Sequence, residues 1–158
     1  MSAVSTDPEA VVQAGVAEGG RAPVPSASPE ERSLHFPAGI PGFAAAKHFS
    51  LRPWGDSPTP FQVLECREVP RLCFVAVDPV LFFPDYAPEV GAEAYRALDM
   101  QRSDPVDVLV ILSLHSRPEE TTANLLGPVV INPASGRALQ AVLSGSGFDP
   151  QTPLFRRA

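Results

Sequence analysis

Cysteine is scarce in this sequence, with Cys66 and Cys73 as the two examples in 158 residues. Two cysteines cannot build the disulfide framework that stabilises small secreted domains, and one pair needs two further ligands to complete a zinc site. We therefore expect two buried thiols. A cross-strand disulfide is the alternative, because a hairpin turn is expected between the two residues, although a reducing compartment would keep that bond open.

Basic charge and long apolar runs are scarce as well. The chain has 12 Lys and Arg against 18 Asp and Glu, which gives a formal net charge of −6. An acidic chain lacks the sequence-independent attraction to phosphate that supports nucleic-acid binding. Its start shows no basic residues followed by an apolar stretch of about 7 to 15 residues, and no apolar run approaches the roughly 18 residues of a membrane-spanning helix. We expect a cytoplasmic protein that contacts neither nucleic acid nor membrane directly.

Aromatic residues are missing before Phe36. Residues 1–32 are instead rich in Ala, Gly, Pro and Ser, a composition that buries too little apolar area to offset the entropy lost on ordering. We expect residues 1–32 to be a flexible, disordered tail, with a docked element as the alternative. Residues 33–158 are expected to form one β-rich domain, since domains commonly have about 100 to 150 residues.

Short apolar runs separated by turn residues fill this domain, which is the pattern of a β-rich fold. The run at residues 106–114 is apolar at nearly every position, so we expect a central strand covered on both faces. Residues 88–98 repeat apolar side chains at helical spacing and predict one short helix. The sequence thus predicts a mainly β, antiparallel, barrel-like domain, with a sandwich as the alternative. Its strands are expected at residues 48–52, 61–67, 72–78, 107–116, 123–132 and 138–143.

Residue patterns that carry catalytic or metal chemistry are weak. His35, His48 and His115 do not have the spacing of metal ligands. The Gly39–Gly42 segment contains a proline at a position where a phosphate-binding loop needs a backbone N–H donor. We expect no metal, no cofactor and no enzymatic activity. Two alternatives stay open: a small enzyme that uses His115 and Asn124, and a nucleic-acid-binding β-barrel whose surface aromatics stack on bases.

Five segments, in this order and spacing, together resemble the FliW family of flagellar assembly factors. The resemblance covers residues 34 to about 155, and Gln140 in a following strand adds to it. The chain departs from the family pattern at Ala44, at the Glu65–Cys66 pair and at Phe148. The five segments are FPAGIPGF at residues 36–43, PFQVL at 60–64, FVAVDP at 74–79, PDY at 84–86 and NLLGPVVIN at 124–132.

This resemblance implies a small barrel-like domain that binds proteins. Its expected partners are CsrA, an RNA-binding translational repressor, and flagellin, bound in mutually exclusive complexes. Flagellin that accumulates in the cytoplasm would occupy the protein and release CsrA to repress flagellin translation, and export of flagellin would reverse this.

The candidate partner-binding residues form a loop of neighbouring aromatics. Phe82, Phe83 and Tyr86 surround Pro84, and we expect them to be exposed because adjacent rings cannot all enter one core. Replacing Phe83 or Tyr86 by Ala is therefore expected to weaken a complex without unfolding the domain. Phe43 and Asn124 are further candidates, each with a structural alternative: Phe43 as a plug of the core, and Asn124 as a residue that fixes a turn.

Overall fold

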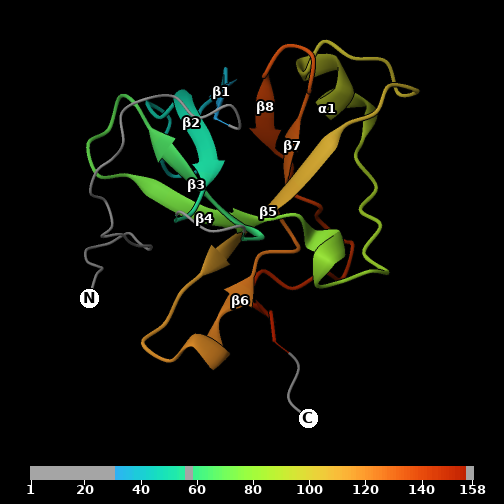
Figure 1. The fold of residues 1–158 in the computed structure, drawn as a ribbon. Helices are drawn as coiled ribbons and strands as arrows, with labels where there is room; N and C mark the ends of the chain where they lie inside the picture. The colour runs from blue at the N-terminus through green and yellow to red at the C-terminus, as the bar shows by residue number, and fades with distance from the viewer. Residues whose placement is uncertain (1–30, 56–58, 156–158) are drawn as a thin grey trace.

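The computed structural model describes residues 31–55 and 59–155, so the expected tail over residues 1–32 lies almost entirely outside the described residues. Figure 1 shows short strands that curl around a common interior, with one short helix at the side. The strands are β1 (Arg32–His35), β2 (His48–Pro53), β3 (Phe61–Cys66), β4 (Cys73–Val77), β5 (Asp107–Ser113), β6 (Thr122–Ala123), β7 (Val129–Ile131), β8 (Ala138–Gln140) and β9 (Thr152–Pro153). The helix is α1 (Ala92–Ala97), and two 3-10 turns are η2 (Pro79–Leu81) and η3 (Pro118–Glu120).

All strand pairings in the sheet are antiparallel. The order is β1-β2-β3-β4-β5-β6-β9, and β7 pairs with the first half of β5 and with β8. β1 meets the β7–β8 branch of the sheet: the His35 amide of β1 donates to the Gly136 carbonyl 2.9 Å away in the β7–β8 turn, and His35 forms an isolated bridge with Arg137. Figure 1 shows β1 beside β8 accordingly. The sheet is curled and barrel-like without a full ladder at this seam, which confirms the predicted fold class.

β5 is covered on both faces, as predicted. Leu109 points into the barrel, where it joins buried side chains from β1, β2, β3, β7 and β8, such as Phe49 and Leu64. Val110 and Leu112 face outward and are covered by Tyr86, Leu125 and other residues that follow the strands. The helix α1 covers the outer side of β7, where Val130 packs with Leu98. The domain therefore has an inner core and an outer layer on opposite faces of one sheet.

The predicted strand at residues 123–132 is broken in two, which corrects that prediction. Leu112 pairs with Ala123 and Leu109 pairs with Val129, so the partner segment advances six residues while β5 advances three. The three extra residues form a bulge. Its backbone groups are satisfied locally: the Asn124 Oδ1 accepts from the Gly127 amide at 2.9 Å, and the Gln140 Nε2 donates to the Gly127 carbonyl at 2.9 Å.

Other boundaries differ modestly from the prediction. β1 and β9 were not predicted, and β5 ends at Ser113 rather than Ser116. The expected hairpin between Cys66 and Cys73 exists, but Cys66 belongs to the inner core whereas Cys73 pairs with Glu65 on the outward side. Side chains on opposite faces of a sheet cannot be bridged, and the two cysteines form no disulfide.

The seam between β1 and the β7–β8 turn requires a glycine at position 136. Gly136 has φ +82°, and a Cβ atom built there would lie 2.5 Å from the Ser33 carbonyl oxygen. Gly145 has a similar φ of +80° with no atom within 4 Å of its Cβ position. We expect Gly145→Ala to lose about 1–2 kcal/mol of unfolding free energy from the left-handed backbone, and Gly136→Ala to lose more because the turn must move away from β1. Urea denaturation of both variants measures the difference, and equal losses would contradict a tight seam.

Candidate functional site

Four aromatic rings from separate segments form a continuous row on the outer layer. Trp54 follows β2 and lies 6.2 Å from Phe61 at the start of β3, measured between ring centroids. Phe61 lies 6.1 Å from Phe82, and Phe82 lies 6.1 Å from Phe155 near the end of the chain. Trp54 remains 42% exposed, and Phe155 is exposed as well. We call Trp54, Phe61, Phe82 and Phe155, together with the exposed Val80 and Leu81 that directly precede Phe82 in the chain, the aromatic row.

The 3-10 turn η2 holds the aliphatic part of the aromatic row toward solvent. Asp78 caps this turn, since its side chain accepts a hydrogen bond from the Val80 amide at 3.1 Å, and Pro79 occupies the first position of the turn. Proline suits that position because its φ is fixed and it has no amide hydrogen to satisfy. Pro79 is buried, whereas Val80 and Leu81 are the exposed residues of η2, with Leu81 at 60%. Such a turn presents apolar side chains on a stiff support.

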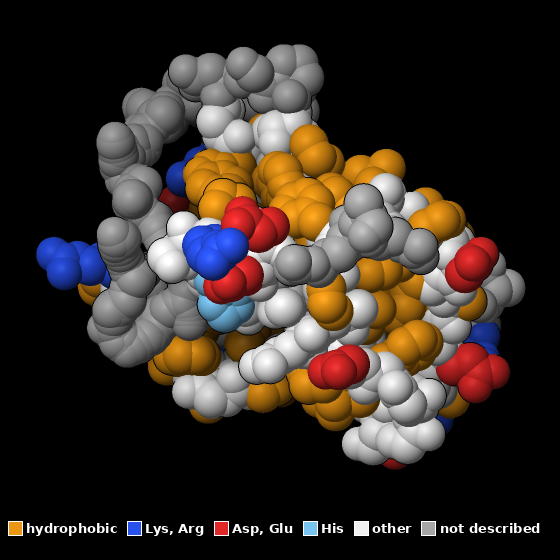
Figure 2. All heavy atoms as spheres, turned by 90° about the horizontal axis from the view of Figure 1, so that it is seen from below, with side chains coloured by type: hydrophobic (Ala, Val, Ile, Leu, Met, Phe, Trp, Pro, Cys, Tyr) orange, Lys and Arg blue, Asp and Glu red, His pale blue; other side chains and the backbone are white. Residues whose placement is uncertain are grey.

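Hydrophobic side chains also gather on one face of the molecule. Figure 2 shows them over a broad part of the face seen from below, with charged side chains scattered among them. Isolated exposed apolar residues are normal on protein surfaces, whereas contiguous apolar patches mark contacts with other molecules. The aromatic row qualifies as a contiguous patch because each ring contacts the next.

Tyr86 is buried, which corrects the expectation that it is exposed. It is 8% exposed, its hydroxyl donates to the Leu125 carbonyl at 2.7 Å, and its ring packs edge-on against Phe148. Burial raises the pKa of Tyr86 to about 12. Replacing Tyr86 by Ala would remove packing and leave the Leu125 carbonyl without this donor, so it would perturb the bulge and the outer layer rather than a free surface.

The other predicted site residues are spread over the molecule. Phe82 and Phe83 are half-buried against the outer layer, and Phe82 belongs to the aromatic row. Phe43 is exposed at a separate place, the loop between β1 and β2, where its ring packs on Phe74 over the inner core. Asn124 is half-buried and fixes the bulge through Gly127, which is the structural role considered for it. Partner contact by these residues stays a prediction.

The sequence did not indicate Trp54, Phe155, Val80 or Leu81 as site residues. Phe155 and Trp54 are about a hundred positions apart in the chain, and only the folded domain connects them, through Phe61 and Phe82. A local signal existed for η2: the FVAVDP segment ends in Asp78 and Pro79, which cap and begin this turn, and two exposed aliphatic residues follow directly.

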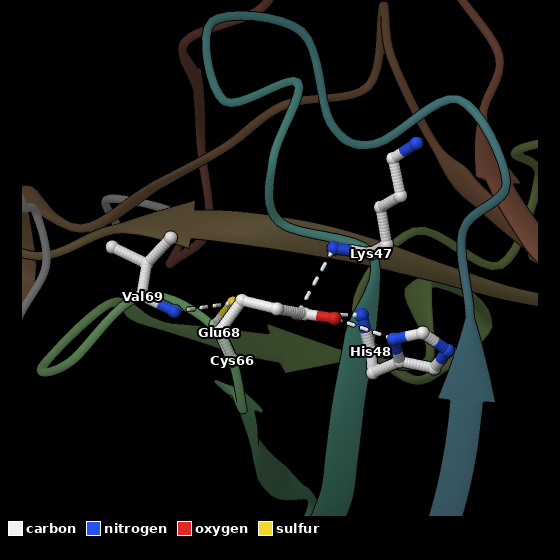
Figure 3. A network of polar contacts seen from close by, with 5 residues as sticks. All are labelled: Lys47, His48, Cys66, Glu68 and Val69. Carbon is white, nitrogen blue, oxygen red and sulfur yellow. Dashed lines mark hydrogen bonds and ion pairs between the residues drawn. The ribbon is translucent and has the colours of Figure 1, made fainter.

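A polar network ties the start of β2 to the β3–β4 turn, as Figure 3 shows. The Glu68 carboxylate accepts from the backbone amides of Lys47 at 3.2 Å and His48 at 2.9 Å, and it pairs with the His48 ring nitrogen Nδ1. The His35 ring stacks on His48 with centroids 4.7 Å apart. Cys66 contacts Glu68, and burial raises the pKa of its thiol. The network therefore ties the start of β2 to the β3–β4 turn, and the raised pKa of Cys66 disfavours its thiolate form.

Glu68 gives the protein a pH-dependent element. The hydrogen bond from the His48 side chain, followed by that from the His48 amide, lowers the pKa of Glu68 from 4.5 to about 2. Because the pKa is lower in the folded state, the ionised Glu68 carboxylate stabilises the fold above about pH 4.5. This stabilisation is lost as the pH falls toward about 2 and the carboxylate is protonated. We expect the stability difference between the wild type and Glu68→Gln to shrink over that range, measured by chemical denaturation.

A control variant for this prediction removes the His48 side chain and keeps the Glu68 carboxylate. In His48→Ala, NMR titration of the Glu68 carboxyl carbon should give a pKa closer to 4.5, because the hydrogen bond from the His48 side chain, the largest cause of the shift, is gone. A stability difference that stays constant from pH 5 to pH 2 would contradict the assignment.

The fold and the site define a class of protein: a small antiparallel, barrel-like domain with an aromatic surface. No helix in the described part of the chain is long and apolar enough to cross a bilayer. The model of the family described as FliW protein matches residues 24–154. The chain belongs to the FliW family, whose members are flagellar assembly factors.

Individual relatives agree with this assignment. The chain is 37% identical over 127 residues to the flagellar assembly factor FliW of Syntrophomonas wolfei, covering 80% of this chain and 81% of that protein. It is 33% identical over 125 residues to the FliW of Bacillus subtilis, covering 79% and 87% of the two chains. A crystal structure of a flagellar assembly factor FliW superposes with a TM-score of 0.74 at 29% identity, covering 85% of this chain and 92% of that one. The family gives the protein a role in flagellar assembly.

Proposed function

We propose that this protein is a cytoplasmic regulator that acts by binding proteins rather than by catalysis. Its partners are a CsrA-type translational repressor and flagellin, and the two complexes exclude each other. The observation that carries the proposal is the aromatic row, a contiguous apolar surface built from segments that the fold holds in place. Aromatic anchors are the residues that contribute most at protein interfaces, because they bury much area at a small cost in conformational entropy.

Charge near the aromatic row supports a basic partner. Between Arg71 and Arg96 the chain contains four acidic residues and no Lys or Arg. Two of them, Asp78 and Asp85, lie exposed on either side of the Val80 to Pro84 segment. An RNA-binding repressor carries basic surface, because phosphate contacts dominate its affinity for RNA. Acidic groups around an apolar surface would speed the encounter with such a partner and orient it.

Mutual exclusion follows if both partners cover the aromatic row. Competition for one surface needs no conformational change, since occupancy depends on the two concentrations and affinities. Each tenfold change in the ratio of concentration to Kd corresponds to about 1.4 kcal/mol. Accumulation or export of flagellin can supply such a change in concentration, which is what a switch linked to secretion requires.

The role of the aromatic row in partner binding can be tested by placing a charge at Leu81, its most exposed aliphatic residue. Leu81→Asp should weaken binding of both the CsrA-type repressor and flagellin by tenfold or more in calorimetric titration, because burying an unpaired carboxylate at an interface is unfavourable. Val142→Asp is the matched control, since Val142 is 57% exposed and Leu81 is 60% exposed. A thermal melt of each variant verifies the fold. Equal affinities for the two variants would contradict the role of the aromatic row.

A further inference from the structure

The chain enters the domain close to the aromatic row. β1 begins at Arg32, which lies opposite Leu51 of β2, and Trp54 follows only three residues after Leu51. At about 3.3 Å per residue, this places the first ring of the aromatic row roughly 10 Å along β2 from the point where the amino-terminal segment joins. The segment of residues 1–30 is therefore attached at the end of the sheet that carries Trp54.

The segment is long enough to cover the aromatic row. Sixteen positions separate Val16 from Arg32, and a random-coil chain of sixteen residues has a root-mean-square end-to-end distance of about 20 Å. The rings of the aromatic row follow one another at 6.2, 6.1 and 6.1 Å, so the tether reaches its whole length. A tether of this kind gives an effective concentration in the millimolar range, at which even a contact with a Kd of about 1 mM is half occupied.

The composition of the segment fits such a contact. Val11, Val12 and Val16 supply small aliphatic side chains close together in its sequence. They cannot form a core among themselves, but the aromatic row offers the apolar surface they lack. The model of the family begins at residue 24, so these valines belong to a part of the chain outside the family domain.

We propose that the amino-terminal segment docks on the aromatic row through Val11, Val12 and Val16 and competes with the protein partner for this surface. The docking is a contact within one chain. Its regulatory consequence rests on the proposed function, because it assumes that the partner also uses the aromatic row. A segment that occupies the surface part of the time lowers the apparent affinity for the partner without blocking it.

The single tryptophan of the protein reports on this contact directly. Trp54 belongs to the aromatic row and is the one tryptophan in the sequence. In the full chain, the variant V11S/V12S/V16S should show about twofold stronger quenching of Trp54 fluorescence by acrylamide than the wild type, and its affinity for a CsrA-type repressor should rise about two- to fivefold. The control T6S/Q13S changes polar residues of the same segment and should match the wild type in both measurements.

The two readouts separate the failure of this inference from the failure of the proposed function. Identical quenching in the wild type and the valine variant would overturn the docking. Increased quenching with unchanged partner affinity would uphold the docking and overturn the aromatic row as the partner site. If dilution increases the quenching of Trp54 in the wild type, a second copy of the chain covers the aromatic row. This result also overturns docking within one chain.

Discussion

The structure depends on one strand that is apolar on both faces. Leu109 of β5 faces the inner core while Val110 and Leu112 face the outer layer, so neither side of β5 can be left to solvent. Curling the sheet covers the inner face, and the close approach of Gly136 to Ser33 brings β1 and the β7–β8 turn together there. The outer face needs separate cover, and the segments that connect and follow the strands supply it.

The outer layer is built from short segments, and the aromatic row lies at its edge. The Phe82 to Tyr86 segment, Leu125 of the bulge, and Phe148 and Leu154 near the carboxyl-terminal end each contribute side chains to the outer layer. Tyr86 is fully integrated through Leu125 and Phe148, whereas Phe82 contacts both the layer and the exposed rings. The same rings that complete the packing therefore present apolar surface to a partner. A binding surface built this way is rigid, because its anchors are held by the layer beneath them.

The sequence predicted most of the fold because its strands are marked by apolar runs and turn residues. The bulge was missed because Leu125 to Ile131 reads as one apolar strand, although Gly127 and Pro128 interrupt its backbone pattern. Tyr86 was expected at the surface because adjacent aromatic rings cannot all enter a single core, whereas the domain has a second, outer layer that buries it. The aromatic row could not be predicted, because its rings come from separate segments of the chain that meet only in the folded domain: Trp54, Phe61, Phe82 and Phe155.

The central claim is that the aromatic row is the surface that partners cover. Amide hydrogen exchange of the protein, free and bound to a CsrA-type repressor, measures this most directly, since a bound partner slows the opening and exchange of the backbone beneath it. The account predicts new protection at residues 78–83 and 152–155, with the Phe43 loop at residues 37–46 unchanged. Protection confined to the Phe43 loop or to α1, with no change at η2, would contradict it.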